Sequence, residues 1–349
     1  MTKLEPKFIL SKKKVFKKVD FLKNIVDEVS YSWKTNPKVG EILNNKNYCY
    51  LSVHSINELE QVKNKSKIWY FPFAINNDDL NILINKYNIK NFIIDNEDDL
   101  NILRKYIKKN KIIINVLIRM KLQENSIQTG KHFIFGMNTK KTKELLTKIH
   151  QDKNINKIGI HVHRKTQNIS QWSLEEDIFE SLDEQYLKMI DIINIGGGLP
   201  GKYKNTNNET QNYIFEKIKK FTQKLHTYNI QVIIEPGRFI ASSSVKLETH
   251  IIKIIDNTCF LNCSIFNGCL DTVVANIKLL VQEETKENQG EKYTLKGCTP
   301  DSCDILRYSV YLKNPKVNDK ITFLNCGAYT YTTNFCALKE IKYEILDDF

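Results

Sequence analysis

A lysine at the end of a predicted strand is the first residue of this sequence that points to chemistry. Lys34 lies in the run Tyr31–Pro37 (YSWKTNP), at the end of the predicted strand Val29–Trp33 and before a new helix. In an α/β barrel this position directs the amine to the face where barrel enzymes carry out their reactions. An amine there can form a Schiff base with an aldehyde cofactor. Because the chain has 52 lysine and arginine residues, a solvated surface lysine is the simpler interpretation of Lys34 taken alone.

Three later motifs, each at the end of a predicted strand, change that interpretation. They are Gly196-Gly197-Gly198, Glu235-Pro236-Gly237-Arg238 and Gly327-Ala328-Tyr329. Consecutive glycines let a backbone approach a phosphate closely, so that its amides donate to the phosphate oxygens. In this order, the lysine run and the three motifs resemble those of the fold-type III pyridoxal-phosphate decarboxylases, the ornithine/diaminopimelate decarboxylase family. The resemblance extends from about Pro6 to Phe335.

The resemblance implies a set of residues that bind pyridoxal phosphate. Lys34 matches the lysine that forms the Schiff base, and Glu235 matches the carboxylate that keeps the ring nitrogen protonated. His161, near the end of the predicted strand Lys157–Val162, matches the histidine that stacks on the cofactor ring. The remaining cofactor contacts that the resemblance implies are Gly196, Gly197, Gly198, Gly237, Arg238 and Tyr329.

Structural interpretations of the same residues stay open. Glu235 also suits a salt bridge at a strand end, the three glycines suit a tight loop, and Tyr329 suits a core position. After the histidine, family members commonly carry a Gly-Ser pair whose serine helps to bind phosphate, whereas this chain has His163-Arg164. Arg164 either replaces that contact with a charge or points to solvent.

Glu58 is a further catalytic candidate, because it resembles the family glutamate that lies near the Schiff-base lysine. A carboxylate in the first turn of a helix, favoured by the helix dipole, explains Glu58 equally well. No metal is expected.

The run Gly297–Asp304 resembles the family loop that sets specificity and supplies a proton donor to the active site of the partner subunit. Pro300 stands where the family carries its cysteine, and Cys298 and Cys303 flank it. Cys303 is the predicted donor because Cys298 precedes the turn; a buried structural role is the alternative for both thiols. Asp301 takes the position of the acidic residue that binds a distal amine. The predicted substrate contacts are Asp301, Cys298 and Phe335.

The elements that must position these residues alternate between short apolar runs and amphipathic helical patterns, as in a parallel α/β architecture. Eight runs have the pattern of strands, which predicts a (β/α)8 barrel, and the resemblance implies the alanine-racemase-like form of it. The eight predicted strands are Val29–Trp33, Tyr48–Val53, Ile68–Phe73, Asn91–Ile94, Ile112–Ile118, Lys157–Val162, Met189–Ile195 and Gln231–Ile234. After Arg238 the pattern changes to β-like runs with few long helices: Lys246–Asp256, Thr258–Phe266, Lys278–Val281, Tyr293–Gly297 and Asp319–Asn325. We predict a barrel over residues 11–240, and an antiparallel β domain over residues 241–349 that is joined by the N-terminal strand within residues 1–10.

Composition limits the class of protein. A chain of 349 residues with 41% hydrophobic content suits a barrel and a second domain. The eight scattered cysteines favour a reducing compartment. With no apolar run of about 18 residues and no apolar segment after the N-terminal lysines, we expect a cytoplasmic protein without membrane contact. The net charge of +12 is spread along the chain without a nucleic-acid-binding motif, so no nucleic-acid partner is expected.

The predicted function is decarboxylation of a basic amino acid, ornithine or lysine, as in polyamine biosynthesis. The predicted assembly is a homodimer with shared active sites. Diaminopimelate, or a siderophore or natural-product intermediate, is the alternative substrate, although the segment Phe266–Leu280 has no arginine for a distal carboxylate. An inactive regulatory paralogue is a further alternative, and the retained Lys34, Glu235 and Arg238 argue against it. A racemase on a related barrel is disfavoured because such enzymes generally pair the ring nitrogen with arginine.

Overall fold

The computed structural model describes residues 4–122, 135–164, 172–206 and 209–349 of the chain. The chain divides into two compact units, here named the barrel unit and the β unit. The barrel unit comprises Val19–Pro200 and Glu209–Gly237. The β unit comprises Met1–Lys18, Gly201–Asn208 and Arg238–Phe349. Among the described residues, no helix combines the length and the apolar character needed to cross a bilayer.

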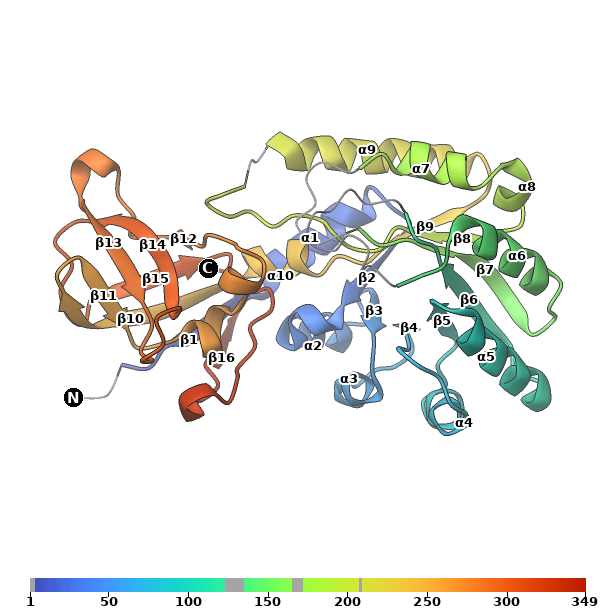
Figure 1. Ribbon diagram of the computed structural model, residues 1–349, viewed down its shortest axis with the longest axis horizontal. Helices are drawn as coiled ribbons and strands as arrows, with labels where there is room; N and C mark the ends of the chain where they lie inside the picture. The colour runs from blue at the N-terminus through green and yellow to red at the C-terminus, as the bar shows by residue number, and fades with distance from the viewer. Residues whose placement is uncertain (1–3, 123–134, 165–171, 207–208) are drawn as a thin grey trace. The chain divides into compact units, whose positions relative to one another are not determined.

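Eight parallel strands close into a barrel in the order of the sequence, which confirms the predicted (β/α)8 fold (Figure 1). Each strand pairs with the next, and the last pairs with the first through Glu28–Ile233 and Val29–Ile234. The strands are β2 (Glu28–Ser32), β3 (Tyr50–Val53), β4 (Ile68–Tyr70), β5 (Asn91–Ile94), β6 (Ile114–Arg119), β7 (Ile155–His161), β8 (Ile192–Asn194) and β9 (Gln231–Ile234).

Two barrel strands, β4 and β8, are much shorter than predicted, and β3 and β6 are shorter by two residues and one residue. The predicted run Ile68–Phe73 ends as a strand at Tyr70, and Pro72 within it has no N–H to donate to a ladder. The predicted run Met189–Ile195 contributes only Ile192–Asn194, because Met189 and Ile190 bond back to the turn that precedes the strand. The pairing between strands, rather than the apolar run, therefore sets the ends of β4 and β8.

Helices lie outside the ring of strands (Figure 1). Asn36 begins the first of them, since its side chain accepts hydrogen bonds from the amides of Lys38 and Val39 and Pro37 occupies the first helical turn. The helices of the barrel unit are α2 (Pro37–Asn45), α3 (Ile56–Gln61), α4 (Asn77–Leu80) continued by a π-helix (Asn81–Lys86), α5 (Glu97–Asn110), α6 (Thr139–His150), α7 (Leu174–Ser181), α8 (Glu184–Leu187) and α9 (Glu209–His226).

One apolar cluster is built from five different strands of the barrel. It consists of Trp69, Ile93, Leu117, Ile192 and Ile233, all nearly inaccessible to solvent. Removing such a side chain from a packed core typically costs about 2–5 kcal/mol. Two of these five strands, β6 and β8, end in polar residues, Arg119 and Asn194.

The β unit is built on one sheet of eight strands, mostly antiparallel, in the order β12-β15-β10-β11-β13-β14 with β1 beside β10 and β16. Two pairs, β1 with β16 and β11 with β13, are parallel. The strands are β1 (Lys7–Ser11), β10 (Val245–Ile255), β11 (Thr258–Leu261), β12 (Leu280–Val281), β13 (Glu291–Lys296), β14 (Ile305–Leu312), β15 (Lys320–Leu324) and β16 (Lys342–Leu346). The chain also forms α1 (Lys12–Lys23), α10 (Arg238–Ser244) and α11 (Asp271–Val274).

The N-terminal strand β1 pairs with β10 and β16 of this sheet, as predicted. The strands β14 and β16 were not predicted from the sequence. The predicted strand Thr258–Phe266 ends at Leu261, because Ser264 and Asn267 cap a π-helix over Ile265–Cys269.

We expect Gly159→Ala to destabilise the barrel. A Cβ on Gly159 in β7 would lie 2.0 Å from the carbonyl oxygen of Ile192 and 2.8 Å from Cδ2 of Leu117. The backbone of β8 must move to admit it, at a cost of about 3 kcal/mol. The midpoint of urea unfolding measures this. Gly268→Ala is the control, because its new Cβ meets only side-chain tips at 3.3 Å and 3.4 Å. Equal midpoints for the two variants would contradict the tight contact between β7 and β8.

Candidate active site at the carboxyl ends of the barrel strands

Polar side chains occupy neighbouring positions where the barrel strands end. Ser32 of β2 is in register with Ser52 of β3. Arg119 of β6 is in register with His161 of β7, which is itself in register with Asn194 of β8. Because parallel strands end at one edge, these five residues form a polar layer on the face where barrel enzymes place their active sites.

Lys34 lies beside this layer, in a short 3-10 turn (Trp33–Thr35) that directly follows β2. Its Nζ is 3.4 Å from Nε2 of His54. The side chain is accessible to solvent, yet the protein atoms around it lower the pKa of Lys34 by desolvation, against the opposing charges of Glu235 and Glu58. A lysine with a lowered pKa is more often a neutral amine, the form that acts as a nucleophile.

Glu58 holds His54 next to this lysine. Its Oε2 accepts a hydrogen bond of 2.7 Å from the backbone N–H of His54, and it is 3.6 Å from Nδ1 of the His54 ring. Burial opposes ionisation, but the hydrogen bonds from His54 outweigh it and lower the pKa of Glu58. Glu58 also lies in the first turn of α3, where the hydroxyl of Ser55 caps its amide at 3.1 Å. Glu58 therefore lies both in the first turn of a helix and near Lys34.

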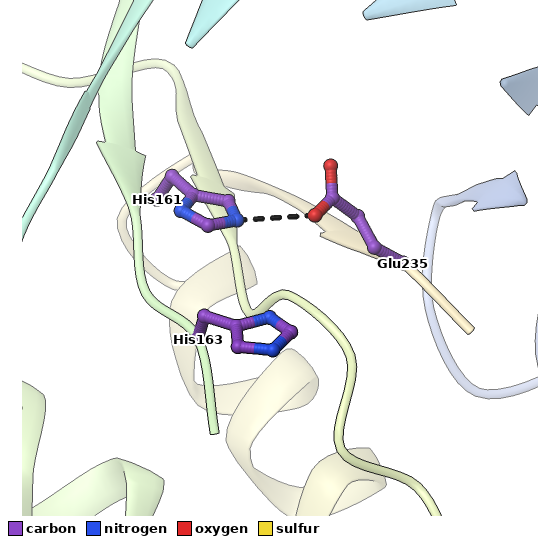
Figure 2. A group of neighbouring side chains, drawn as sticks. All are labelled: His161, His163 and Glu235. Carbon is purple, nitrogen blue, oxygen red and sulfur yellow. Dashed lines mark hydrogen bonds and ion pairs between the residues drawn. The ribbon is translucent and has the colours of Figure 1, made fainter. Parts of the chain in front are cut away.

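Glu235, directly after β9, is a buried carboxylate with donors from three other parts of the barrel. Its Oε1 accepts from the hydroxyl of Ser52 at 2.7 Å and from the side-chain amide of Asn194 at 3.1 Å. Its Oε2 is 3.1 Å from Nε2 of His161 (Figure 2). Burial acts to raise the pKa of Glu235, but His161 and the hydrogen bond from Ser52 hold it well below its usual value. Burial lowers the pKa of His161. Glu235 is thus the ionised partner and His161 the neutral donor.

The three glycines after β8 are held close to the ends of two strands. Gly196 and Gly198 have φ angles of +64° and +94°, a conformation that residues with a Cβ rarely adopt. A Cβ on Gly196 would lie 2.3 Å from the carbonyl oxygen of Val162, and one on Gly197 would lie 2.8 Å from that of Glu235. The amide of Gly196 donates to Asn194 Oδ1 at 2.8 Å, and the amide of Gly197 donates to His163 Nδ1 at 3.2 Å. Two of the three predicted phosphate donors therefore have side-chain acceptors.

The two residues His163 and Arg164 each have a defined partner in the structure. His163 is partly buried and lies next to His161, with ring centroids 6.3 Å apart and planes within 14° (Figure 2). Arg164 is buried, with 1% of its surface exposed, and pairs with Asp177 of α7. The alternative that Arg164 points to solvent is therefore wrong, and its charge is balanced by Asp177.

Gly237 connects the glutamate motif to the lysine turn. A Cβ at this position would lie 2.0 Å from Oγ1 of Thr35. The amide of Ser32 donates to the carbonyl of Pro236 at 3.5 Å, so the two segments run against each other. Only a residue without a side chain permits this approach next to Lys34.

These side chains surround a cavity of about 390 Å³, within the range of small-molecule sites. Its lining includes Lys34, His54, Arg119, His161, His163 and Glu235, with Phe71, Phe73 and Phe135 as aromatic walls. His161, His163 and Glu235 form one group with donor atoms within 4.8 Å of one another. The positive charge of Arg119, which acts to lower the pKa of His163, disfavours a metal cation in that group.

The predicted residues Arg238 and Tyr329 lie in the β unit. The buried guanidinium of Arg238 pairs with both carboxylate oxygens of Asp271 and donates to the hydroxyl of Tyr203 at 2.9 Å. The ring of Tyr329 lies over this guanidinium, with its centroid 5.0 Å away. Tyr329 is half-buried, so a simple core role does not describe it.

The loop Gly297–Asp304 also lies in the β unit, and Asp304 holds its shape. This buried carboxylate accepts from the amides of Ile265 and Thr299 at 2.9 Å and 3.0 Å. Asp301 accepts from the amide of Cys303 at 2.6 Å. Both Cys298 and Cys303 are exposed, so the alternative of a buried structural thiol is wrong for each. Phe335 packs against Phe266, with ring centroids 4.5 Å apart.

Four residues of the cavity network were not predicted from the sequence: Ser52, His54, Arg119 and Asn194. Each lies at or next to the end of a barrel strand, where a polar residue interrupts an apolar run. That position is a usable signal in a barrel, but their partners depend on strand register.

Comparison with known proteins agrees with this geometry. Residues 12–242, more than half of the chain, match the family described as "Pyridoxal-dependent decarboxylase, pyridoxal binding domain". The chain belongs to the pyridoxal-dependent decarboxylase family. A "Probable ornithine decarboxylase" of Dictyostelium discoideum is 24% identical over 276 residues, which cover 71% of this chain and 57% of that protein. The chain thus matches little more than half the length of this relative.

Solved structures of lysine, arginine and lysine/ornithine decarboxylases share the fold. Lysine decarboxylase from Selenomonas ruminantium has a TM-score of 0.83 at 22% identity, over 98% of this chain and 93% of that chain. Arginine decarboxylase of Paramecium bursaria Chlorella virus, bound to agmatine, has a TM-score of 0.81 at 20% identity, over 99% and 96%. Lysine/ornithine decarboxylase from Vibrio vulnificus, complexed with putrescine, has a TM-score of 0.80 at 19% identity, over 99% and 95%.

The cavity fits the family cofactor at its aldehyde and ring ends. It offers a lysine of lowered pKa and an ionised carboxylate. Because Nε2 of His161 donates to Glu235, Nδ1 is the unprotonated nitrogen of the neutral ring, and it is buried with no hydrogen-bond partner among the described residues. The glycines of the decarboxylase family's phosphate end are present, but His163 holds one of their amides.

We expect Glu235→Gln to flatten the acid dependence of stability. A carboxylate whose pKa is lowered by folding stabilises the fold above its unfolded-state pKa of about 4.3 and loses this contribution as the pH falls toward the folded value. The free energy of urea unfolding should therefore fall more steeply in the wild type than in the variant between about pH 5 and pH 3, by up to about 1.4 kcal/mol per pH unit. The exposed Glu175→Gln is the control. Parallel pH profiles for wild type and Glu235→Gln would show that Glu235 is not the low-pKa group.

Proposed function

We propose that this chain is a pyridoxal-phosphate-dependent decarboxylase of a basic amino acid, with ornithine or lysine as the substrate class. The observation that carries the proposal is the presence of Lys34 and the ionised Glu235 in one cavity at the carboxyl end of the barrel. The family match and the fold shared with lysine, arginine and ornithine decarboxylases support it.

Bound pyridoxal phosphate supplies an electron sink for the electron pair left when the α-carboxylate departs. Lys34 would hold the aldehyde end, and Glu235 would accept a hydrogen bond from the protonated ring nitrogen. His161 would pack against the ring while it orients Glu235 through Nε2. The glycines after β8, with Gly237 beside the lysine turn, leave room for the backbone to approach the ligand.

Proton transfer at Lys34 is assigned to its neighbour His54, which Glu58 positions. Desolvation lowers the pKa of Lys34, and Nε2 of His54, at 3.4 Å, is within reach to take or return its proton. Glu58 fixes the position of His54 through the backbone hydrogen bond of 2.7 Å. Glu58 therefore acts as a positioning residue in this proposal.

Glu235 keeps its charge because three groups surround it in a buried position. Ser52, Asn194 and His161 satisfy its oxygens, so that the carboxylate does not need to be protonated to be buried. A carboxylate that stays ionised near neutral pH keeps a proton on the ring nitrogen of a bound pyridine. This is the role that a neutral glutamine at position 235 does not fill.

We assign the substrate contacts and the proton donor to the loop Gly297–Asp304, acting in the site of a second subunit. The Asp304 carboxylate is occupied by hydrogen bonds from Ile265 and Thr299. Cys303, by contrast, is exposed and Asp301 is only half-buried. The Asp301 carboxylate suits the cationic tail of ornithine or lysine. Cys303 is the proposed donor because Pro300, at the position of the family cysteine, has no acidic proton. Cys298 and Phe335 complete the proposed substrate side.

We expect Lys34→Ala to lose decarboxylation and the covalent attachment of cofactor. Carbon dioxide release is measured with ornithine, lysine, arginine and diaminopimelate, and attachment is measured by borohydride reduction and peptide mapping. The wild type should act on ornithine or lysine, with loss of turnover by at least about a thousandfold in the variant, since no other amine takes over. Lys46→Ala, at an exposed lysine after α2, is the control and should keep both.

Three results would contradict parts of this assignment. Normal turnover in Lys34→Ala, or an adduct on another lysine, removes Lys34 from its role. Preference for diaminopimelate overturns the substrate class. An adduct on Lys34 without release from any of the four compounds favours a regulatory paralogue.

We expect a homodimer in which each site combines two chains. When Lys34→Ala is mixed with Asp301→Ala under subunit exchange, one site of each mixed dimer has an intact barrel and an intact loop. Random equimolar mixing should restore about one quarter of wild-type activity. Mixing Lys34→Ala with Glu235→Gln is the control, since both changes lie in the barrel and every site stays damaged. No recovery in the first mixture despite demonstrated exchange, or an active monomer, would end the shared-site assignment.

A further inference from the structure

The amide of Gly197 donates to Nδ1 of His163, so the histidine ring occupies a position that suits an anion. Successive amides of a glycine run with positive φ angles at Gly196 and Gly198 form a concave donor surface. One side of this run is closed by the carbonyl oxygens of Val162 and Glu235, which a Cβ would approach to 2.3 Å and 2.8 Å. His163 lies against the run itself, with Cε1 3.3 Å from the position of a Cβ on Gly197.

The hydrogen bond from the Gly197 amide determines which nitrogen of the His163 ring is unprotonated. An amide N–H donates, so Nδ1 accepts with its lone pair and carries no proton. The groups that act on the ring are Arg119 of β6, His161 of β7, Lys34 after β2 and Glu235 after β9. Burial, together with the charge of Arg119, keeps the pKa of His163 well below its usual value, and Glu235 opposes this effect.

A phosphate that enters the same position competes with Nδ1 for the Gly197 N–H. Once displaced, a neutral Nδ1 lone pair would face phosphate oxygens, which are also acceptors, and the two would repel. A proton on Nδ1 removes the conflict, because an imidazolium ring has two donors and forms a charge-assisted hydrogen bond with phosphate.

We propose that His163 is a proton-coupled specificity residue for the phosphate group of the cofactor. When phosphate binds, the hydrogen bond from the Gly197 amide to Nδ1 breaks and one from the same amide to a phosphate oxygen forms. Nδ1 takes one proton from solvent, and the positive ring balances one of the negative charges of the phosphate. The inference rests on the proposed function, because it takes this phosphate to be that of pyridoxal phosphate.

The consequence is a dependence of affinity on pH that belongs to the phosphate group alone. Ligand binding that takes up a proton strengthens as the pH falls. Protonation of the phosphate itself, with a second pKa of about 6, limits the useful range to higher pH. The neighbouring Arg164 does not supply this charge, since it is buried against Asp177.

The test compares pyridoxal phosphate with pyridoxal, which lacks the phosphate, on the full chain after removal of bound cofactor. Dissociation constants come from absorbance titrations at several pH values between about 6.5 and 8.5, where the phosphate is mostly dianionic. The ratio of the two constants cancels the titration of Lys34 and of the aldehyde. In the wild type, the dissociation constant of pyridoxal phosphate divided by that of pyridoxal should rise by up to about tenfold for each unit of rising pH. In His163→Gln, which cannot titrate, the ratio should shift only as the phosphate ionises.

Calorimetric titration in two buffers of different ionisation enthalpy gives a second measurement, the number of protons taken up. We expect about one proton more for wild type than for His163→Gln with pyridoxal phosphate, and no difference with pyridoxal. His163→Asn replaces His163→Gln if the latter does not fold, as judged by circular dichroism.

Equal pH profiles and equal proton uptake in wild type and variant would overturn the inference while leaving the proposed function intact. Absence of a Lys34-dependent absorption band with both compounds would overturn the proposed function and the inference with it.

Discussion

The buried charge of Glu235 is the constraint on which the site depends. An ionised carboxylate withdrawn from water is costly unless its oxygens are hydrogen-bonded. Its donors come from the end of β3 in Ser52, the end of β7 in His161 and the end of β8 in Asn194. These strands are brought together only when the barrel closes between β9 and β2. Closure of the barrel and ionisation of Glu235 therefore stabilise each other, and loss of either disturbs both.

The charges around the cavity set the protonation of each member of the site. Desolvation lowers the pKa of Lys34, and burial lowers the pKa of His161 and His163, which favours a neutral amine and neutral rings. Hydrogen bonds lower the pKa of Glu58 and of Glu235, although burial opposes both shifts. Neutral bases beside ionised carboxylates are the arrangement that acid–base chemistry requires near neutral pH.

The barrel is that of its family, while the sequence departs from the family pattern at two places, the pair His163-Arg164 and the loop Gly297–Asp304. His163 and Arg164 replace two small residues, and the structure gives each a specific partner, the Gly197 amide and Asp177. Pro300 removes the thiol at the family position, and exposed cysteines stand on either side of the turn. A shared fold thus carries altered contacts at two places, which is why function has to be inferred from the site and not from the fold.

The sequence by itself determined the order of the eight barrel strands, the positions of Lys34 and Glu235 after strands, and the glycine run. All of these follow from local patterns, because an apolar run followed by glycine, proline or a polar residue marks a strand end. The tertiary structure alone decided which groups meet. The partners of Glu235 lie 183 residues away at Ser52 and 74 residues away at His161, and their contact depends on register and closure. The ends of β4 and β8, the π-helix over Ile265–Cys269 and the burial of Arg164 were decided in the same way. Pairing between distant segments, and not the preference of any segment, fixes hydrogen-bond partners and burial.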